Sequence, residues 1–71
     1  MTDPVRQELF RILAELSQAQ PDVRLGQLIT NLSYLARGLS NEAVWDVEDQ
    51  ELLTAARQHL EQWRAKQAAG V

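Results

Sequence analysis

Residues 21–29 read P-D-V-R-L-G-Q-L-I and separate two segments in which apolar residues recur at helical spacing. Pro21 disfavours helical geometry in the residue before it, so a first helix is expected to end near residue 19. Asp22 can accept hydrogen bonds from the free N–H groups of a following helix, which predicts a second helix over residues 23–37. This stretch therefore ends one helix and begins the next.

Further helix boundaries lie on both sides of this stretch. Residues 44–53 read V-W-D-V-E-D-Q-E-L-L, and Asp46 is expected to open a third helix whose first turn is rich in acids. Asp3 followed by Pro4 is typical of a helix start, because aspartate caps free N–H groups and proline suits the first helical position. Helices are thus expected over residues 4–19, 23–37 and 47–66, with a loose tail from about residue 67.

Each expected helix carries one apolar stripe, as a helix with a single buried face does. Short connections between three such helices are typical of an all-α three-helix bundle in which neighbouring helices run antiparallel. The stripes consist of Val5, Leu9, Ile12, Leu13 and Leu16 in the first helix, of Leu25, Leu28, Ile29, Leu32, Leu35 and Ala36 in the second, and of Leu52, Leu53, Ala56, Leu60 and Trp63 in the third.

Two glycines mark the second helix. Gly38 follows its last apolar residue, which predicts that the helix stops there in a left-handed cap. Gly26 lies early in the helix, where glycine costs about 1 kcal/mol relative to alanine. Close packing of another helix against Gly26 is the favoured explanation, since an anion-binding nest usually needs more than one glycine. The connector over residues 39–46 has room for one helical turn from Ser40.

Composition limits the class of protein. The 71 residues are 45% hydrophobic and 24% charged, which predicts a single soluble domain over residues 1–71. Cysteine is absent and histidine occurs once, so disulfides, thiolate metal sites and multi-histidine sites within one chain are excluded. No apolar run reaches the length of a membrane span and no signal-peptide pattern begins the chain, so we expect a cytoplasmic protein with no membrane contact, in a bacterium-like setting. A domain this small is marginally stable, and association into a homodimer is the remaining common way to stabilise it.

The net charge of −3 is unevenly distributed. Residues 1–40 balance four acids with four arginines, whereas five acids follow in a stretch without any basic residue. A duplex-binding module would normally show a basic face, so nucleic acid is not an expected partner. These five acids are Glu42, Asp46, Glu48, Asp49 and Glu51. A calcium loop would need regular ligand spacing and a glycine turn, so a solvated first helical turn is the favoured interpretation of the last four.

The two quoted stretches together resemble a group of short bacterial proteins. In that group P-D-x-R-L-G-Q-L is followed by an aromatic residue and a V-E-D-x-E-L segment, and the resemblance covers roughly residues 21–53. The first motif is moderately specific and the second is loose. Trp45 stands where another aromatic residue is typical, and Gln20 where an aromatic often precedes the proline. The resemblance implies a compact helical domain and carries over no catalytic residues.

A second resemblance concerns the turn Gly38–Asn41, which reads G-L-S-N. It is similar to the middle of a LuxR-type helix-turn-helix, in which such a turn precedes a short scaffold helix. In that family a small residue and then a basic recognition helix follow. Trp45 takes the small position here and residues 46–51 are acidic, so a helix-turn-helix transcription regulator is kept only as the alternative function.

Enzymatic chemistry has little support in the sequence. His59 lies at the edge of the third apolar stripe, where a lone histidine is usually packed or partly exposed. No serine or threonine stands in a motif that would activate it as a nucleophile, and three short helices offer little cleft. We therefore expect no enzyme activity, no cofactor and no metal.

The remaining features favour protein–protein interaction. Arg24 begins the second helix, where its charge opposes the helix dipole, so we expect it to pair with Glu48 or Asp49, within the chain or across a dimer. Phe10, Tyr34 and Trp45 lie off the main stripes, which indicates a second apolar surface or, for Trp45, a broader core. The predicted role is that of a small accessory or interaction module that forms a homodimer or binds a protein with a basic surface.

Overall fold

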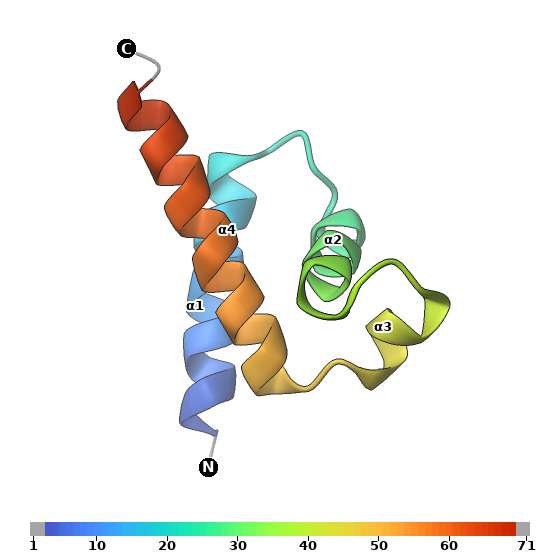
Figure 1. The fold of residues 1–71 in the computed structure, drawn as a ribbon. Coiled ribbons are helices and arrows are strands. Elements are labelled where there is room, and N and C mark those ends of the chain that lie inside the picture. Colours follow the sequence, from blue (N-terminus) through green and yellow to red (C-terminus); the bar gives the residue numbers. More distant parts are fainter. Residues whose placement is uncertain (1–2, 70–71) are drawn as a thin grey trace.

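The computed structural model describes residues 3–69, which are helical and contain no strand (Figure 1). The all-α prediction is therefore confirmed for this part of the chain. Within it, the connector between the second and third predicted helices forms a short helix of its own. The helices are α1 (Pro4–Ala19), α2 (Leu25–Arg37), α3 (Asn41–Asp46) and α4 (Asp49–Ala69).

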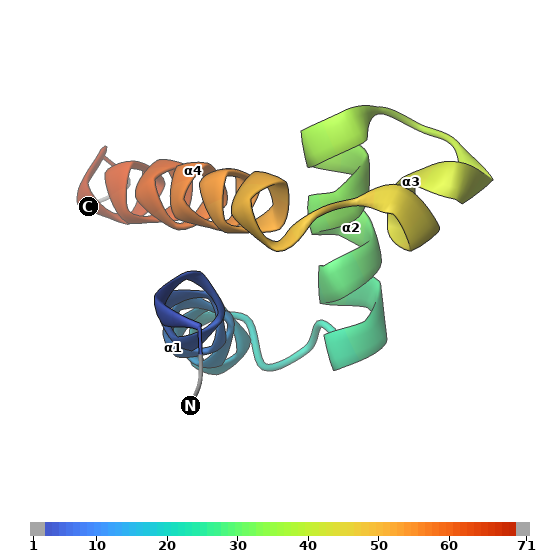
Figure 2. The same cartoon turned by 90° about the horizontal axis from the view of Figure 1, so that it is seen from below.

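The long helices α1 and α4 lie side by side and run in the same direction (Figure 1). Arg6 near the start of α1 pairs with Asp49 at the start of α4, and Glu15 near the end of α1 pairs with Arg64. Helix α2 crosses this pair steeply, so the chain returns to the first end of α1 before α4 begins (Figure 2). Neighbouring helices along the chain were expected to run antiparallel, which would also leave the first and last long helices parallel, as α1 and α4 are. The expectation is wrong for α2, which crosses both of them steeply instead (Figure 2).

The core lies where α4 packs against both α1 and α2. The stripes of α1 and α4 are confirmed, while that of α2 is confirmed only in its middle: Leu25 and Leu35 are 56% and 47% exposed. A steep crossing brings only a short length of each helix into contact, so the ends of the α2 stripe extend beyond the core. The buried cluster consists of Leu9, Ile12, Leu16, Leu28, Leu32, Leu53, Ala56 and Leu60.

Helix α1 begins as predicted, because the Val5 N–H donates to Asp3 Oδ1 over 2.8 Å. Helix α2 begins later than predicted, with Arg24 rather than Asp22 in the capping position and no side-chain cap. The Val23 N–H donates to the Gln20 carbonyl over 3.0 Å and the Val23 side chain packs against the core. Asp22 therefore lies in the turn before α2, one residue ahead of Val23, which anchors this turn to the core.

Helix α2 ends at Arg37, and Gly38 follows it as predicted. Its backbone angles, φ 94° and ψ 171°, lie outside the left-handed helical region that was expected, in a region that only glycine readily adopts. Gly26 is exposed, and a Cβ added there would meet nothing within 4 Å. The explanation of Gly26 by close helix packing is therefore wrong.

Helix α4 begins at Asp49 rather than 47, because Asp46 ends α3 and Val47 is extended. The Leu52 N–H donates to the Glu48 carbonyl over 2.9 Å. Helix α4 runs to Ala69 and so includes residues 67–69, which the sequence placed in a tail. The last two residues of that expected tail lie outside the described residues. No helix within residues 3–69 has the length and apolar character needed to cross a membrane.

Candidate functional site

Exposed apolar side chains gather around α3. Leu39 in the connector is 88% exposed and Trp45 on α3 is 87% exposed, while the neighbouring Val44 is 39% exposed. Isolated exposed apolar residues are common on protein surfaces, but Trp is on average highly buried. The high exposure of Trp45 excludes, within the single chain, the alternative in which it completes a broader core.

The backbone of α3 explains why Trp45 faces outward. Helix α3 packs against α2, and Ala43, which is 1% exposed, is its buried residue. Trp45 follows two positions later, which places it about 200° around the helix from Ala43. Glu42 lies about 60° from Trp45 on the same outer side. The short helix is thus anchored by a small residue and presents an aromatic one.

The acid-rich stretch divides into two functionally different sets. Asp49 accepts from Arg6 over 2.8 Å, and Glu51 accepts from Arg37 over 2.9 Å. These pairs tie the start of α4 to α1 and α2, which the prediction of a solvated first turn missed. Three other acids of the stretch are exposed and form no ion pair within the described residues: Glu42, Asp46 and Glu48. We call Leu39, Val44 and Trp45, together with these three acids, the α3 surface.

The six residues predicted for interaction are not brought together. Trp45 and Glu48 belong to the α3 surface, whereas Asp49 is engaged by Arg6. Arg24 is exposed and makes no salt bridge with any residue of the described chain, so its predicted pairing with Glu48 or Asp49 is wrong within the single chain. Phe10 is 59% exposed on α1, a helix that lies across the molecule from α3 (Figures 1 and 2), and Tyr34 is half-buried on α2.

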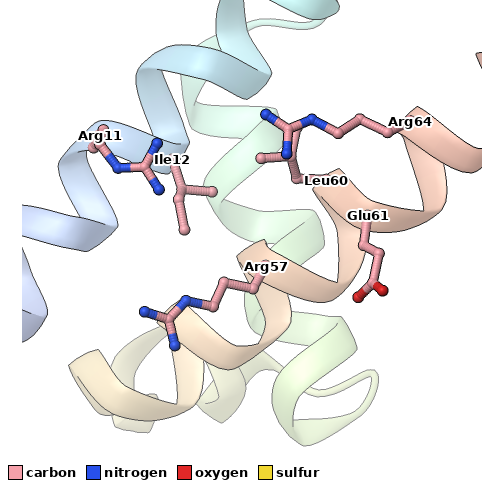
Figure 3. Close-up of a pocket in the computed structure, with 6 residues that line it drawn as sticks. All are labelled: Arg11, Ile12, Arg57, Leu60, Glu61 and Arg64. Atoms are coloured by element: carbon pink, nitrogen blue, oxygen red, sulfur yellow. The ribbon is translucent and has the colours of Figure 1, made fainter.

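A groove that the sequence did not predict runs along the seam between α1 and α4. It has a volume of about 360 Å³ and carries three arginine side chains around an apolar floor (Figure 3). A second hollow of about 290 Å³ continues the same seam and shares Arg57 with the first. We call the first hollow the arginine groove; its lining consists of Arg11, Ile12, Arg57, Leu60, Glu61 and Arg64.

The three arginines of the groove differ in their partners. Arg11 is hydrogen-bonded to Glu8, and this bond is the main reason that the pKa of the Glu8 carboxyl lies below its ordinary value. Arg64 donates to Glu15 over 2.7 Å. Arg57 is exposed and has no ion pair among residues 3–69, so its guanidinium is the one available to a ligand.

Sequence reasoning missed this groove because its arginines come from two helices, and no local pattern shows which side chains of two packed helices meet along their seam. One signal was present: Arg57 and Arg64 are seven residues apart, a spacing that puts both on one face of a helix. Arg11 joins them only through the contact between α1 and α4.

The histidine lies in a third, smaller hollow of about 150 Å³ beside Trp63. His59 Nε2 is 3.4 Å from Gln20 Oε1, and the ring is half-buried. No serine or threonine lines this hollow, so the imidazole has no hydroxyl beside it to activate. No protein-family model, curated protein or solved structure matches the chain. Its chemistry must therefore be read from the α3 surface and the arginine groove.

Proposed function

We propose that this chain is a non-enzymatic interaction module whose α3 surface binds a protein partner. The observation that carries the proposal is the 87% exposure of Trp45 on a six-residue helix whose opposite side is anchored on α2. Tryptophan is enriched among the residues that dominate the binding energy of interfaces, and such residues lie in well-desolvated centres. An exposed indole held by a packed helix has the features of such an anchor.

The acids around Trp45 indicate the chemistry of the partner. Glu42, Asp46 and Glu48 carry no ion pair within the part of the chain that the structure describes, so a partner would meet their full charge. An apolar pocket rimmed by lysine or arginine complements such a surface, and charge complementarity contributes mainly to specificity and to the rate of association. The resemblance to short bacterial proteins favours the bacterial cytoplasm as the setting.

The alternative, a transcription regulator that uses the Gly38–Asn41 turn, has less support. The charged side chains that follow this turn, Glu42 and Asp46, are exposed and acidic, and they would meet the like charge of DNA phosphates. Binding to a protein would not place these acids next to phosphates.

Affinity capture tests the proposal. The immobilised chain, incubated with an extract of its native cells, should retain a protein that Trp45→Ala loses, because this substitution removes the anchor and leaves the fold intact. Leu25→Ala is the matched control, since Leu25 is 56% exposed but lies at the other end of α2. If Trp45→Ala captures the same proteins as the native chain, the α3 surface is not the binding site.

A further inference from the structure

We infer that the α3 surface of one copy docks in the arginine groove of a second copy, and that two copies exchange their α3 surfaces in this way. The inference rests on the proposed function, because it names the partner of the same α3 surface. The two surfaces are complementary in charge, and Trp45 supplies the docking helix with an exposed aromatic anchor.

The apolar fit concerns Trp45. Its indole is 87% exposed, and the bottom of the groove is lined by the core residues Ile12 and Leu60, which are 1% and 5% exposed (Figure 3). The groove volume of about 360 Å³ lies within the range of pockets that hold small ligands. Trp45 projects from a helix of one and a half turns, short enough to approach the seam between α1 and α4. Docking would therefore remove one face of the indole from water.

The charge fit concerns Arg57. The nearby Glu8 is already engaged by Arg11, and Figure 3 shows the Glu61 carboxylate turned away from both Arg11 and Arg57. Glu42 lies on the same side of α3 as Trp45, so an indole seated in the groove would bring this carboxylate to the arginine rim. A guanidinium in contact with the indole face adds a cation–π attraction, for which tryptophan is the best aromatic partner.

A single chain cannot make this contact with itself. Helix α3 packs on α2, while the groove opens on the face of α1 and α4 that has α2 behind it (Figure 3). The ion pairs Arg6–Asp49 and Arg37–Glu51 fix the start of α4 next to α1 and α2, and so hold α3 away from the groove. A second copy can place its α3 surface in the groove that the first copy's own α3 cannot reach. Burial between the two copies also stabilises a domain of this small size.

Mixing two variants tests the exchange. Trp45→Ala removes the anchor and keeps the groove, whereas Arg57→Glu disables the groove and keeps the anchor. We expect the native chain to form dimers at micromolar concentration in sedimentation equilibrium, and each variant alone to associate about tenfold more weakly or less. In an equimolar mixture one of the two exchanged contacts is intact, because the α3 surface of Arg57→Glu meets the groove of Trp45→Ala. A one-to-one complex should therefore form that is weaker than the native dimer but tighter than the dimer of either variant. Arg24→Glu makes the same charge change outside the groove and should dimerise like the native chain.

Three results would overturn the inference: a native chain that stays monomeric at high micromolar concentration, a variant that dimerises like the native chain, or a mixture that associates no more tightly than either variant alone. Circular dichroism checks that both variants fold, and Arg57→Gln replaces Arg57→Glu if the reversed charge unfolds the helix. A monomeric native chain whose captured protein is lost with Trp45→Ala would end the self-docking inference and leave the proposed function standing. Capture that is unchanged by Trp45→Ala would end the proposed function itself.

Discussion

Gly26 and Gly38 lie near the two ends of α2 and differ in what their backbones require. Gly38 has φ 94° and ψ 171°, while Gly26 has a helical backbone with open space where a Cβ would stand. A side chain at Gly38 would also find open space. The difference between the two positions therefore comes from backbone conformation alone.

Alanine at these two positions should change the free energy of unfolding in opposite directions. Gly38→Ala should destabilise the chain by about 1–3 kcal/mol, the cost of forcing an L-residue into this backbone region. Gly26→Ala should stabilise it by about 0.4–1 kcal/mol, because alanine loses less backbone entropy on folding. Urea denaturation of both variants beside the native chain measures both changes. A stabilising Gly38→Ala would show that the connector adopts another conformation.

Ion-pair partners at the residue scale could not be predicted from the sequence. Arg24 was expected to find an acid at the start of the last helix, but Asp49 is taken by Arg6, which is 43 positions away in the chain. Which arginine reaches an acid depends on how the helices pack, and the parallel arrangement of α1 and α4 brings Arg6 there. The apolar stripe of α1, by contrast, was predictable because its spacing is a local property.

At the scale of elements, the start of α4 is where three helices are joined. The Glu51 carboxylate accepts from the Glu48 N–H over 3.0 Å and from Arg37 over 2.9 Å. The first contact is one half of a capping box and the second ties α2 to α4. The Glu48 N–H chiefly, and then Arg37, hold the pKa of the Glu51 carboxyl below its ordinary value of 4.5.

This lowered pKa predicts how stability depends on pH. A carboxyl whose pKa is lower in the folded state stabilises the fold above its unfolded value, and that contribution is lost as the pH falls through the folded value. The native chain should therefore lose stability as the pH falls below 4.5. Glu51→Gln should be less stable at neutral pH and should lose less on acidification.

The measurement is the melting temperature between neutral pH and acidic pH for the native chain, Glu51→Gln and Glu61→Gln. Glu61 is exposed and lies near the middle of α4, away from the junction, so its variant should keep the native pH dependence. Part of the dependence should survive in Glu51→Gln, because the pKa of Glu8 is also lowered by its bond to Arg11. If the melting temperature of Glu51→Gln falls on acidification as steeply as that of the native chain, Glu51 does not produce this pH dependence.

Helix existence was more predictable than helix arrangement. The long helices follow from stripes and from punctuation such as Pro21, whereas α3 is too short to give a periodic signal. The steep crossing of α2 over α1 and α4 is encoded in no local pattern. The arginine groove depends on which faces of α1 and α4 meet, so it could not be predicted, while Trp45 was singled out because it lies off every stripe.

At the scale of the whole molecule, α4 is the helix around which the others are arranged. It packs against α1 on one side and α2 on another, whereas α3 packs mainly on α2. Helix α3 contributes one buried side chain, Ala43, while α4 contributes Leu53, Ala56 and Leu60 to the main cluster. The proposed binding element is therefore the least anchored of the four helices.

This difference predicts a gradient of hydrogen exchange. The Val47 amide, which donates to the Ala43 carbonyl over 3.1 Å, should exchange at least about tenfold faster than the Leu60 amide, because a short helix opens locally without unfolding the core. Exchange detected by NMR in dilute solution measures both amides. Equal protection of the two amides would show that α3 opens only with the whole fold.

Raising the protein concentration extends the same measurement to the dimer. If α3 docks in the groove of a second copy, the Val47 amide should gain protection as the concentration rises. The Leu60 amide should change little, because Leu60 is only 5% exposed and is thus already buried in the single chain. The gain should disappear in Trp45→Ala, which keeps the Ala43 anchor on α2. Local opening and self-docking thus act on the same short helix: its weak anchoring allows it to adjust to a partner, and docking should suppress the opening.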